Sequence, residues 1–384
     1  MKNNRRNFIK KSAALASALS AGGLTAGAAG LGFPRENHTA RPATNAIRET
    51  GNFIRDAGMQ MSEAYFGGIN SHKIALCRQM DVLGAVTGIN PKMLGMNDEK
   101  PWDYPAVLAA KQAWDNQGLV LRVIEGPPSL GDKTKLGLEG RDEEIANFIS
   151  FMHHLSKVGV DTICYNWMPV IGWYRTDKAK PGRGGALVTA FNNDAIKDAP
   201  MTQYGAVSKD QLWKTLEYFL KAVVPEAEKA GIKLAMHPDD PQVDQIRGIS
   251  RIMTTVENFD RMLALYPSPN NGITMCQGNF SLMGADIPTI VRAFGKRKLI
   301  HFVHFRNVIG GKFKFEETFH DEGQIDMYEA MKAYYEIGFR GPIRPDHVPT
   351  MAEDSNDFPG YSTIGCLYAN GYIRGLMEAV SKNH

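Results

Sequence analysis

The amino-acid sequence predicts an α/β protein of the (β/α)8 TIM-barrel class, because three features coincide in it. Beyond about residue 57, apolar runs of strand length alternate with segments of helical periodicity as far as the C-terminus. Eight such runs are present, and polar residues suited to chemistry stand at the ends of several of them. This alternation indicates a parallel sheet, and eight strands favour a closed barrel over the alternative, an open doubly wound sheet.

The predicted strands are short and bounded by turn-forming residues. They cover Met61–Phe66, Gly84–Ile89, Leu119–Ile124, Thr162–Trp167, Lys233–His237, Gly272–Cys276, Leu299–Phe305 and Pro342–Pro345. Between them, Asp142–Lys157 carries an apolar helical stripe, and Ser208-x-x-Gln211 is typical of a capping box that opens a helix. The longest break, residues 172–207, is rich in Lys, Gly, Pro and Asn, so we expect a lid or substrate loop at the mouth of the barrel.

The N-terminus differs in kind from the rest of the chain. Arg5-Arg6-Asn-Phe-Ile-Lys precedes a weakly apolar Ala, Ser, Gly and Leu stretch, and Ala26-Gly-Ala offers a small-residue cleavage site. This pattern resembles the signal of the twin-arginine translocase, which exports folded proteins. We therefore expect a periplasmic or otherwise exported protein.

Three regions follow from these signals. We expect a twin-arginine signal peptide at residues 1–28, an irregular N-terminal segment at 29–57, and a single barrel domain at 58–384 that contains the insertion at 172–207.

Charge and cysteine content narrow the class of partner. Residues 1–28 hold five basic residues and no acid, so their removal changes the formal net charge from +3 to −2. No basic run lies elsewhere, which argues against nucleic acid as a partner. Because the sequence has no long apolar run, we expect no stable membrane association after removal of the signal. The four cysteines show no C-x-x-C pairing and predict no disulfide framework. A small acidic molecule remains as the expected partner, and a homo-oligomer stays open.

Four residues that can bind a metal stand at the C-terminal ends of four consecutive predicted strands. They are His237, Cys276, His304 and Asp346. In a barrel these ends converge, and two imidazoles, a thiolate and a carboxylate suit a borderline divalent ion such as Mn²⁺, Fe²⁺ or Zn²⁺, with positions left for substrate oxygens.

The seventh predicted strand contains two histidines, His301 and His304. Because side chains alternate along a strand, His304 shares one face with Arg306, whereas His301 lies on the other. The position of His304 nearer the C-terminal end favours it as the ligand, and we expect His301 to lie outward under a helix.

These residues belong to segments that resemble the mannonate dehydratases over roughly Met61 to Val380. The most specific segments are Arg141-Asp-Glu, Cys164-Tyr-Asn-Trp-Met-Pro-Val, Trp173-Tyr-Arg-Thr, His304-Phe-Arg-Asn-Val, Pro345-Asp-His-Val-Pro and Gly360-Tyr-Ser. The resemblance implies a xylose-isomerase-like barrel and the conversion of D-mannonate to 2-keto-3-deoxy-D-gluconate. It further implies that Mn²⁺ or Fe²⁺ is bound by the four strand-end residues.

The same resemblance assigns further roles. His347 and Tyr361 form the acid–base pair, and Arg306 and Arg175 are candidate anchors for the substrate carboxylate. Asn166, apart from the resemblance, is a weaker candidate for a substrate contact at the mouth of the barrel. Elimination requires one group to remove the C2 proton and another to protonate the departing C3 hydroxide, so these residue types suit the reaction.

Two structural consequences can be tested. Asp346 and His347 are adjacent, so both reach the site only if the chain turns there, which the neighbouring prolines favour. Glu125 and His320 are weaker candidates for the mouth of the barrel, and Asp239 and Asp240 are expected either behind the ligands or in solvent.

Two other functions remain open at this point. A metal-dependent sugar isomerase or epimerase of the xylose-isomerase-like group also gathers ligands at strand ends, although it predicts a carboxylate-dominated site. An exported sugar-acid-binding protein without turnover would keep the pocket but would not need the acid–base pair.

Overall fold

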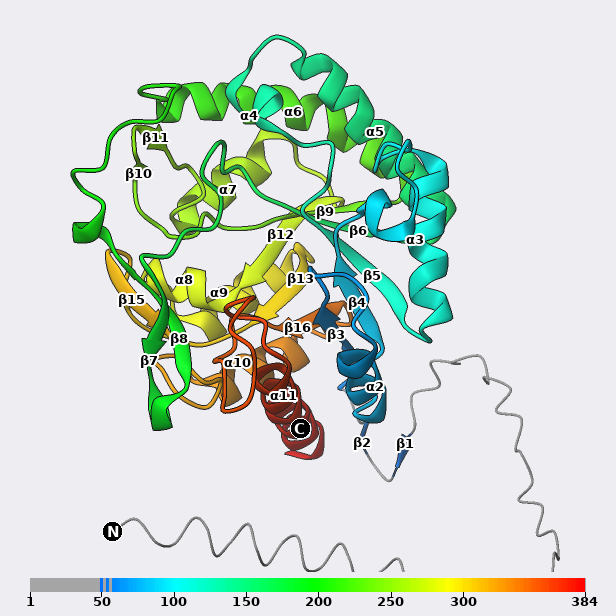
Figure 1. The fold of residues 1–384 in the computed structure, drawn as a ribbon, viewed down its shortest axis with the longest axis vertical. Coiled ribbons are helices and arrows are strands. Elements are labelled where there is room, and N and C mark those ends of the chain that lie inside the picture. The colour runs from blue at the N-terminus through cyan, green and yellow to red at the C-terminus, as the bar shows by residue number, and fades with distance from the viewer. Residues whose placement is uncertain (1–48, 51–52, 55–56, 384) are drawn as a thin grey trace, which may run out of the picture. The chain divides into compact units, whose positions relative to one another are not determined.

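Eight parallel strands close into a barrel, as the sequence predicts (Figure 1). The structure is a computed structural model and describes residues 49–50, 53–54 and 57–383. The barrel strands are β3 (Gln60–Ala64), β4 (Gly84–Thr87), β5 (Val120–Glu125), β6 (Thr162–Tyr165), β9 (Lys233–Met236), β12 (Asn271–Cys276), β13 (Ile300–Phe305) and β16 (Pro342–Pro345). All eight predicted strands are therefore present, with ends shifted by at most two residues.

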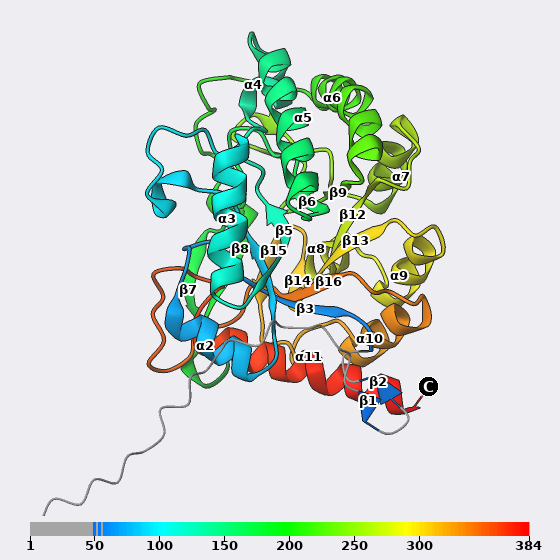
Figure 2. The ribbon, with the colours of Figure 1, turned by 90° about the vertical axis from the view of Figure 1, so that its right-hand side faces the viewer.

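Helices surround the barrel on its outside (Figures 1 and 2). They are α2 (Ser71–Gln79), α3 (Tyr104–Asn116), α4 (Asp132–Leu136), α5 (Arg141–Lys157), α6 (Lys209–Ala230), α7 (Val256–Leu265), α8 (Gln277–Leu282), α9 (Ile287–Lys296), α10 (Met327–Glu336) and α11 (Thr363–Asn383). Short 3-10 turns are η1 (Pro91–Leu94), η2 (Arg183–Gly185) and η3 (Asn193–Ala195). Within the described ranges, no helix is both long enough and apolar enough to cross a bilayer.

The predicted start of α6 is confirmed, but only half of its capping box forms. The Ser208 hydroxyl accepts a hydrogen bond from the Gln211 backbone N–H at 3.1 Å. The Gln211 side chain does not return to the cap; its amide instead donates to the Leu136 carbonyl at 2.9 Å. A cap side chain thus fixes the start of α6, and its neighbour ties α6 to α4.

A small antiparallel sheet lies at the C-terminal end of the barrel and was not predicted. The insertion at 172–207 contributes β7 (Asp177–Pro181) and β8 (Leu187–Asn192) to it. The segment after β13 contributes β14 (Val308–Gly311) and β15 (Lys314–Glu317), so that the strand order is β14-β15-β8-β7. Pairing of β8 with β15 thus connects two segments that are far apart in sequence at the C-terminal end of the barrel.

Smaller elements complete the fold. Two short ladders pair β1 (Glu49–Thr50) with β2 (Phe53–Ile54), and β10 (Gln245–Ile246) with β11 (Ile249–Ser250). The predicted signal peptide lies outside the described residues, as does most of the predicted irregular segment. Small and apolar side chains, among them Val86, Cys164 and Phe302, form a buried cluster contributed by the barrel strands.

Candidate active site

A cavity of about 400 Å³ opens at the C-terminal end of the barrel strands. Six of the predicted site residues line it: Asn166, His237, His304, Asp346, His347 and Tyr361. These six residues therefore meet in one cavity at the C-terminal ends of the strands, where active sites of (β/α)8 barrels lie.

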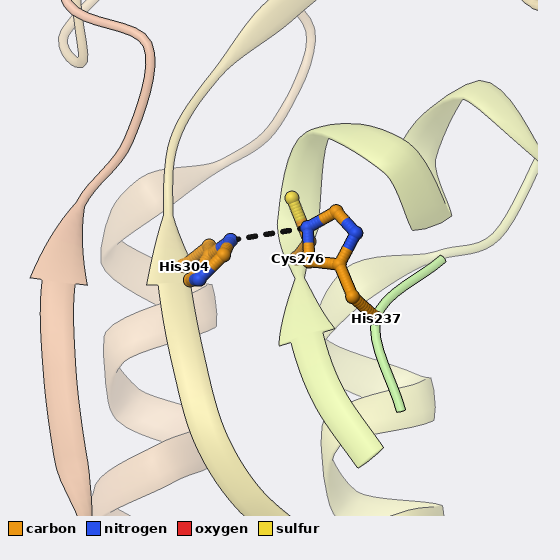
Figure 3. A group of neighbouring side chains, drawn as sticks. All are labelled: His237, Cys276 and His304. Atoms are coloured by element: carbon orange, nitrogen blue, oxygen red, sulfur yellow. Dashed lines mark hydrogen bonds between the residues drawn. The ribbon is translucent and has the colours of Figure 1, made fainter. Parts of the chain in front are cut away.

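The predicted metal-binding atoms converge beside this cavity. The ligand atoms of His237, Cys276 and His304 all lie within 4.8 Å of one another (Figure 3). His237 Nε2 is 3.2 Å from His304 Nδ1, and Asp346 Oδ2 is 3.6 Å from that same nitrogen. Asp346 Oδ2 is also 3.7 Å from Cys276 Sγ. The strand register explains the arrangement, because Cys276 on β12 lies beside His304 on β13.

These distances suit a single divalent ion. Ligands about 2.0 to 2.3 Å from one metal lie roughly 3 to 4 Å from one another, which is the spacing of the donor atoms here. Charge supports the same conclusion. Three buried carboxylates (Asp240, Glu317 and Asp346), the half-buried carboxylate of Glu125 and three buried arginines (Arg175, Arg306 and Arg344) interact around the site, which leaves a net formal charge of −1. Ionisation of Cys276 would make it −2, the charge that a divalent cation balances.

The two histidines predicted as ligands have the protonation state that a metal requires. Burial, together with the nearby His304, lowers the pKa of His237 to about 4. Burial also lowers the pKa of His304, with Arg344 acting in the same direction. Both imidazoles are therefore neutral near pH 7 and can donate a lone pair. Burial raises the pKa of the Cys276 thiol, so the thiolate form depends on a cation.

Glu125 and Arg344 form a second layer behind two of these ligands. Arg344 donates to both Glu125 carboxylate oxygens, at 2.9 and 3.0 Å, and to Asp346 Oδ1 at 2.8 Å. Glu125 Oε2 also lies 3.4 Å from His304 Nε2. Burial alone would raise the pKa of Glu125, but Arg344 and His304 lower it to about 2. The ionised carboxylate can hold the proton on Nε2, which leaves Nδ1 of His304 to face the metal donors.

The two predicted arginine anchors lie within the charged network and are not among the residues that line the described cavity. Arg175 forms an ion pair with Asp240 and donates to Glu317 Oε1 at 2.6 Å. Arg306 donates to Asp240 Oδ2 at 3.2 Å and to Asp346 Oδ2 at 3.1 Å. Their role as anchors stays a prediction, but carboxylates of the protein already neutralise both guanidinium groups.

The chain turns at His347, as the adjacency of Asp346 and His347 requires. His347 has a φ of 41°, in the left-handed region that a residue with a Cβ rarely adopts. The loop that follows packs against His347 at Gly360, where an added Cβ would lie 3.3 Å from His347 Cδ2. Gly360 itself has a φ of 89°. Both Asp346 and His347 consequently line the cavity, and the prediction of a turn is confirmed.

The predicted acid–base pair lies side by side in the cavity. The rings of His347 and Tyr361 meet edge to face, with centroids 5.6 Å apart. Tyr361 Oη donates to Asp346 Oδ1 at 3.0 Å. Burial raises the pKa of Tyr361, and the Asp346 charge adds to this effect, so the phenol carries its proton at neutral pH. His347 Nδ1 lies 2.5 Å from Arg306 Nη1 and 3.1 Å from Glu317 Oε1, which leaves Nε2 for a substrate.

Asn166 is oriented by a lysine that sequence reasoning missed. Its Oδ1 accepts hydrogen bonds from Lys135 Nζ and from the Met168 backbone N–H, both at 3.1 Å. The amide NH₂ of Asn166 is therefore the part left to donate into the cavity. Burial lowers the pKa of Lys135 to about 8, while Asp132 opposes this shift.

The remaining candidates have varied placements. Glu125 lines the cavity, whereas His320 is buried and is not among the lining residues. Asp239 and Asp240 are both buried, so the solvent-facing alternative for them is wrong. His301 lies on the face opposite His304, as expected, but its ring nitrogens contact the Leu234 and Pro269 carbonyls at 2.9 and 3.0 Å. The N-terminal rim of the barrel supplies both of these partners, and the expected position of His301 under a helix stays a prediction.

Sequence reasoning also missed Arg344 and Glu317. Both are charged residues within strands, where charge ordinarily indicates solvent exposure, yet both are buried. A basic residue two positions before a predicted ligand, in an otherwise apolar strand, was the available signal for Arg344.

Comparison with known proteins gives consistent matches. The family model for D-mannonate dehydratase (UxuA) matches residues 59–203 and 199–384. The chain is 35% identical over 352 residues to mannonate dehydratase 2 of Halalkalibacterium halodurans, an alignment that covers 84% of this chain and 100% of that protein.

Solved structures extend the comparison to the fold. The crystal structure of mannonate dehydratase from Streptococcus suis is similar with a TM-score of 0.75 and 32% identity, covering 85% of this chain and 94% of the other. A xylose isomerase domain protein from Planctomyces limnophilus has a TM-score of 0.52 at 13% identity, covering 84% and 98%, which shows the shared barrel fold alone.

Proposed function

This chain belongs to the D-mannonate dehydratase (UxuA) family, and from that premise we propose that it converts D-mannonate to 2-keto-3-deoxy-D-gluconate and water. The observation that carries the proposal is the meeting of metal donors and acid–base residues in one cavity. Tyr361 is hydrogen-bonded to Asp346, one of the four donors, and its ring contacts His347.

We propose that a divalent ion, Mn²⁺ or Fe²⁺, is held by His237, Cys276, His304 and Asp346. Neutral imidazoles with a thiolate and a carboxylate suit such borderline ions better than Mg²⁺ or Ca²⁺. When bound, the ion supplies Lewis acidity that stabilises negative charge on substrate oxygens beside C2.

The protein's own residues then carry the two proton transfers. His347 removes the C2 proton through Nε2, because Glu317 Oε1 accepts the hydrogen bond from its Nδ1–H and so leaves the lone pair on Nε2. Tyr361 protonates the departing C3 hydroxide, since its phenol keeps its proton in the buried site. The electron pair of the broken C–H bond forms the C2–C3 double bond, water leaves, and the resulting enol becomes the keto acid. Asn166 orients substrate hydroxyls through its amide NH₂.

We further propose that the enzyme works outside the cytoplasm. The twin-arginine pattern supports this location, and the match to the family model begins at residue 59, beyond the proposed signal. Export after folding allows the thiolate and its metal to assemble under reducing conditions.

A product assay tests the proposed function. Mn²⁺-loaded protein is incubated with D-mannonate, with other aldonates and with aldoses, and 2-keto-3-deoxy acids and isomerised sugars are quantified. Keto-deoxy acid from D-mannonate is the expected result. Keto-deoxy acid from another aldonate alone would keep the reaction but change the substrate. Isomerised aldose would favour the isomerase, and binding without any product would favour the sugar-acid-binding protein.

A further inference from the structure

The cavity presents one cation that neither the metal site nor the acid–base pair uses. Among the described residues that line the cavity, Lys178 is the one lysine or arginine, whereas Glu125, Asp240, Asp346 and Asp357 all carry carboxylates. An acid substrate entering a cavity rich in carboxylates needs a compensating positive charge. The arginines do not supply it freely, because Asp240 and Glu317 neutralise them.

The backbone at Lys178 departs from regular strand pairing. Strand β7 pairs with β8 at Asp177 with Ala190 and at Lys180 with Val188, so three steps on β7 face two steps on β8. The extra residue makes a β-bulge around Lys178. Bulges change the direction of side chains and are frequent beside active sites.

The Lys178 ammonium group is held at the wall that also carries the proposed base. Its Nζ lies 5.3 Å from the centroid of the Trp173 ring, and that ring lies 5.4 Å from the ring of His347. No ion pair within 4.0 Å joins Lys178 to any carboxylate in the part of the chain that the structure describes. The backbone also fixes this position, since Asn356 Nδ2 donates to the Lys178 carbonyl at 3.1 Å.

A neighbouring lysine on the same strand behaves differently. Lys180 forms an ion pair with Glu316 on β15 and is not among the cavity-lining residues. The two lysines therefore have different surroundings: Lys180 is paired within the four-stranded antiparallel sheet, whereas Lys178 lines the cavity.

We propose that Lys178 determines specificity for acid substrates, its ammonium group binding the substrate carboxylate at the Trp173 side of the cavity. This inference rests on the proposed function, because it concerns the same site and names the group that distinguishes an aldonate from a neutral polyol. A charge-assisted hydrogen bond of this kind favours the anion and leaves a polyol of the same length unaffected.

Equilibrium binding tests the proposal. Isothermal titration calorimetry with D-mannonate and with D-mannitol is carried out on Mn²⁺-loaded protein in a Tyr361→Phe background, which prevents turnover from obscuring the heat. Lys178→Met should raise the Kd for D-mannonate by about tenfold and leave the Kd for D-mannitol unchanged. Lys178→Arg should restore most of the affinity, and Lys180→Met, the matched control, should match the parent protein.

Steady-state kinetics in the wild-type background give a second readout. Lys178→Met should raise KM for D-mannonate with little change in kcat, because the contact exists before and during the reaction. The KM of the wild-type enzyme should rise with ionic strength more steeply than that of the variant.

The outcomes separate this inference from the proposed function. Equal Kd values for D-mannonate in Lys178→Met and Lys180→Met would overturn the inference, as would an equal loss for D-mannitol, which would indicate an effect of shape. Absence of D-mannonate binding to the parent protein would overturn it as well. If D-mannonate binding depends on Lys178 but the wild-type protein forms no keto-deoxy acid, the inference would be supported and the proposed dehydratase activity would be wrong.

Discussion

The two ends of strand β13 carry two buried histidines with opposite surroundings. At the N-terminal end, both ring nitrogens of His301 contact backbone carbonyls. At the C-terminal end, His304 faces His237 through Nδ1, while Glu125 lies beyond its Nε2. The hollow at the His301 end is the larger, about 670 Å³ against about 400 Å³. Neither the size of a cavity nor a buried histidine therefore marks the site.

The two ends of β13 differ in whether side chains able to bind a metal gather there. The N-terminal hollow is lined by Arg122, Asp161, Lys233 and Arg340 with His301, and the metal-donor groups found in the described part of the chain all lie at the other end. The C-terminal cluster has an excess of negative charge and donor atoms that face one another, an arrangement that a divalent cation stabilises. Substitutions at the two ends should therefore differ in kind.

The largest effect is expected from Tyr361→Phe. Loss of the phenolic proton should lower kcat for D-mannonate by about 10²- to 10⁴-fold, because the departing hydroxide loses its acid. The variant should still bind Mn²⁺, which calorimetry checks, since Tyr361 is not one of the four donors and Asp346 loses only the hydrogen bond from the phenol. Full activity in this variant would defeat the assignment of the acid.

Cys276→Ser should weaken metal binding by about 100-fold or more, because a hydroxyl is a poor substitute for a thiolate. Competition with a chromogenic chelator measures this affinity. Metal content equal to that of the wild type would remove Cys276 from the ligand set and leave the two histidines and Asp346.

Glu125→Gln should lower metal affinity by about 10- to 100-fold without removing a ligand, because Glu125 holds the ring of His304 and the arginine that contacts Asp346. His301→Gln, at the other end of the same strand, is the control and should leave metal affinity unchanged. Equal losses in both variants would show a general effect on the barrel and would abolish the contrast between the two ends.

The smallest effect concerns pH at the His301 end. Burial lowers the pKa of His301 to about 4, against the opposing effect of the Leu234 carbonyl. Because the unfolded chain binds this proton near pH 6.5, His301 makes the free energy of unfolding fall as the pH decreases from about 6.5 to 4, by at most about 1.4 kcal/mol per pH unit.

Urea denaturation at several pH values checks this window. His301→Gln should flatten the decline relative to the wild type under the same metal conditions. An unchanged pH dependence would mean that the two carbonyls offset the effect of burial, so that the pKa of His301 is the same in the folded and the unfolded chain.

Local signals were sufficient to predict the barrel and the positions of its site residues. The strands are apolar and regularly spaced, so their ends could be found, and the chemistry of a barrel lies at those ends. The convergence of four candidate ligands could be predicted for this reason, namely of His237, Cys276, His304 and Asp346. The turn at His347 followed from its adjacency to Asp346 and from the neighbouring prolines.

The rest depends on contacts between distant segments. Strand β7 reads Asp-Lys-Ala-Lys-Pro, without apolar alternation, and is defined by its pairing with β8. Asp240 and Glu317 reach Arg175 from separate segments, so the neutralisation of that predicted anchor could not be seen from its own sequence surroundings. The position of a strand end can be predicted from neighbouring residues, but pairing between distant segments cannot.

The central claim is that a divalent cation completes the negatively charged cluster and makes this protein a dehydratase. The most direct test titrates Mn²⁺ into chelator-stripped protein while bound metal and 2-keto-3-deoxy-D-gluconate formed from D-mannonate are measured together. We expect no product in the stripped protein, and a rate that rises with bound metal and saturates near one ion per chain. Full turnover in the stripped protein, or saturation with metal without any product, would contradict the claim.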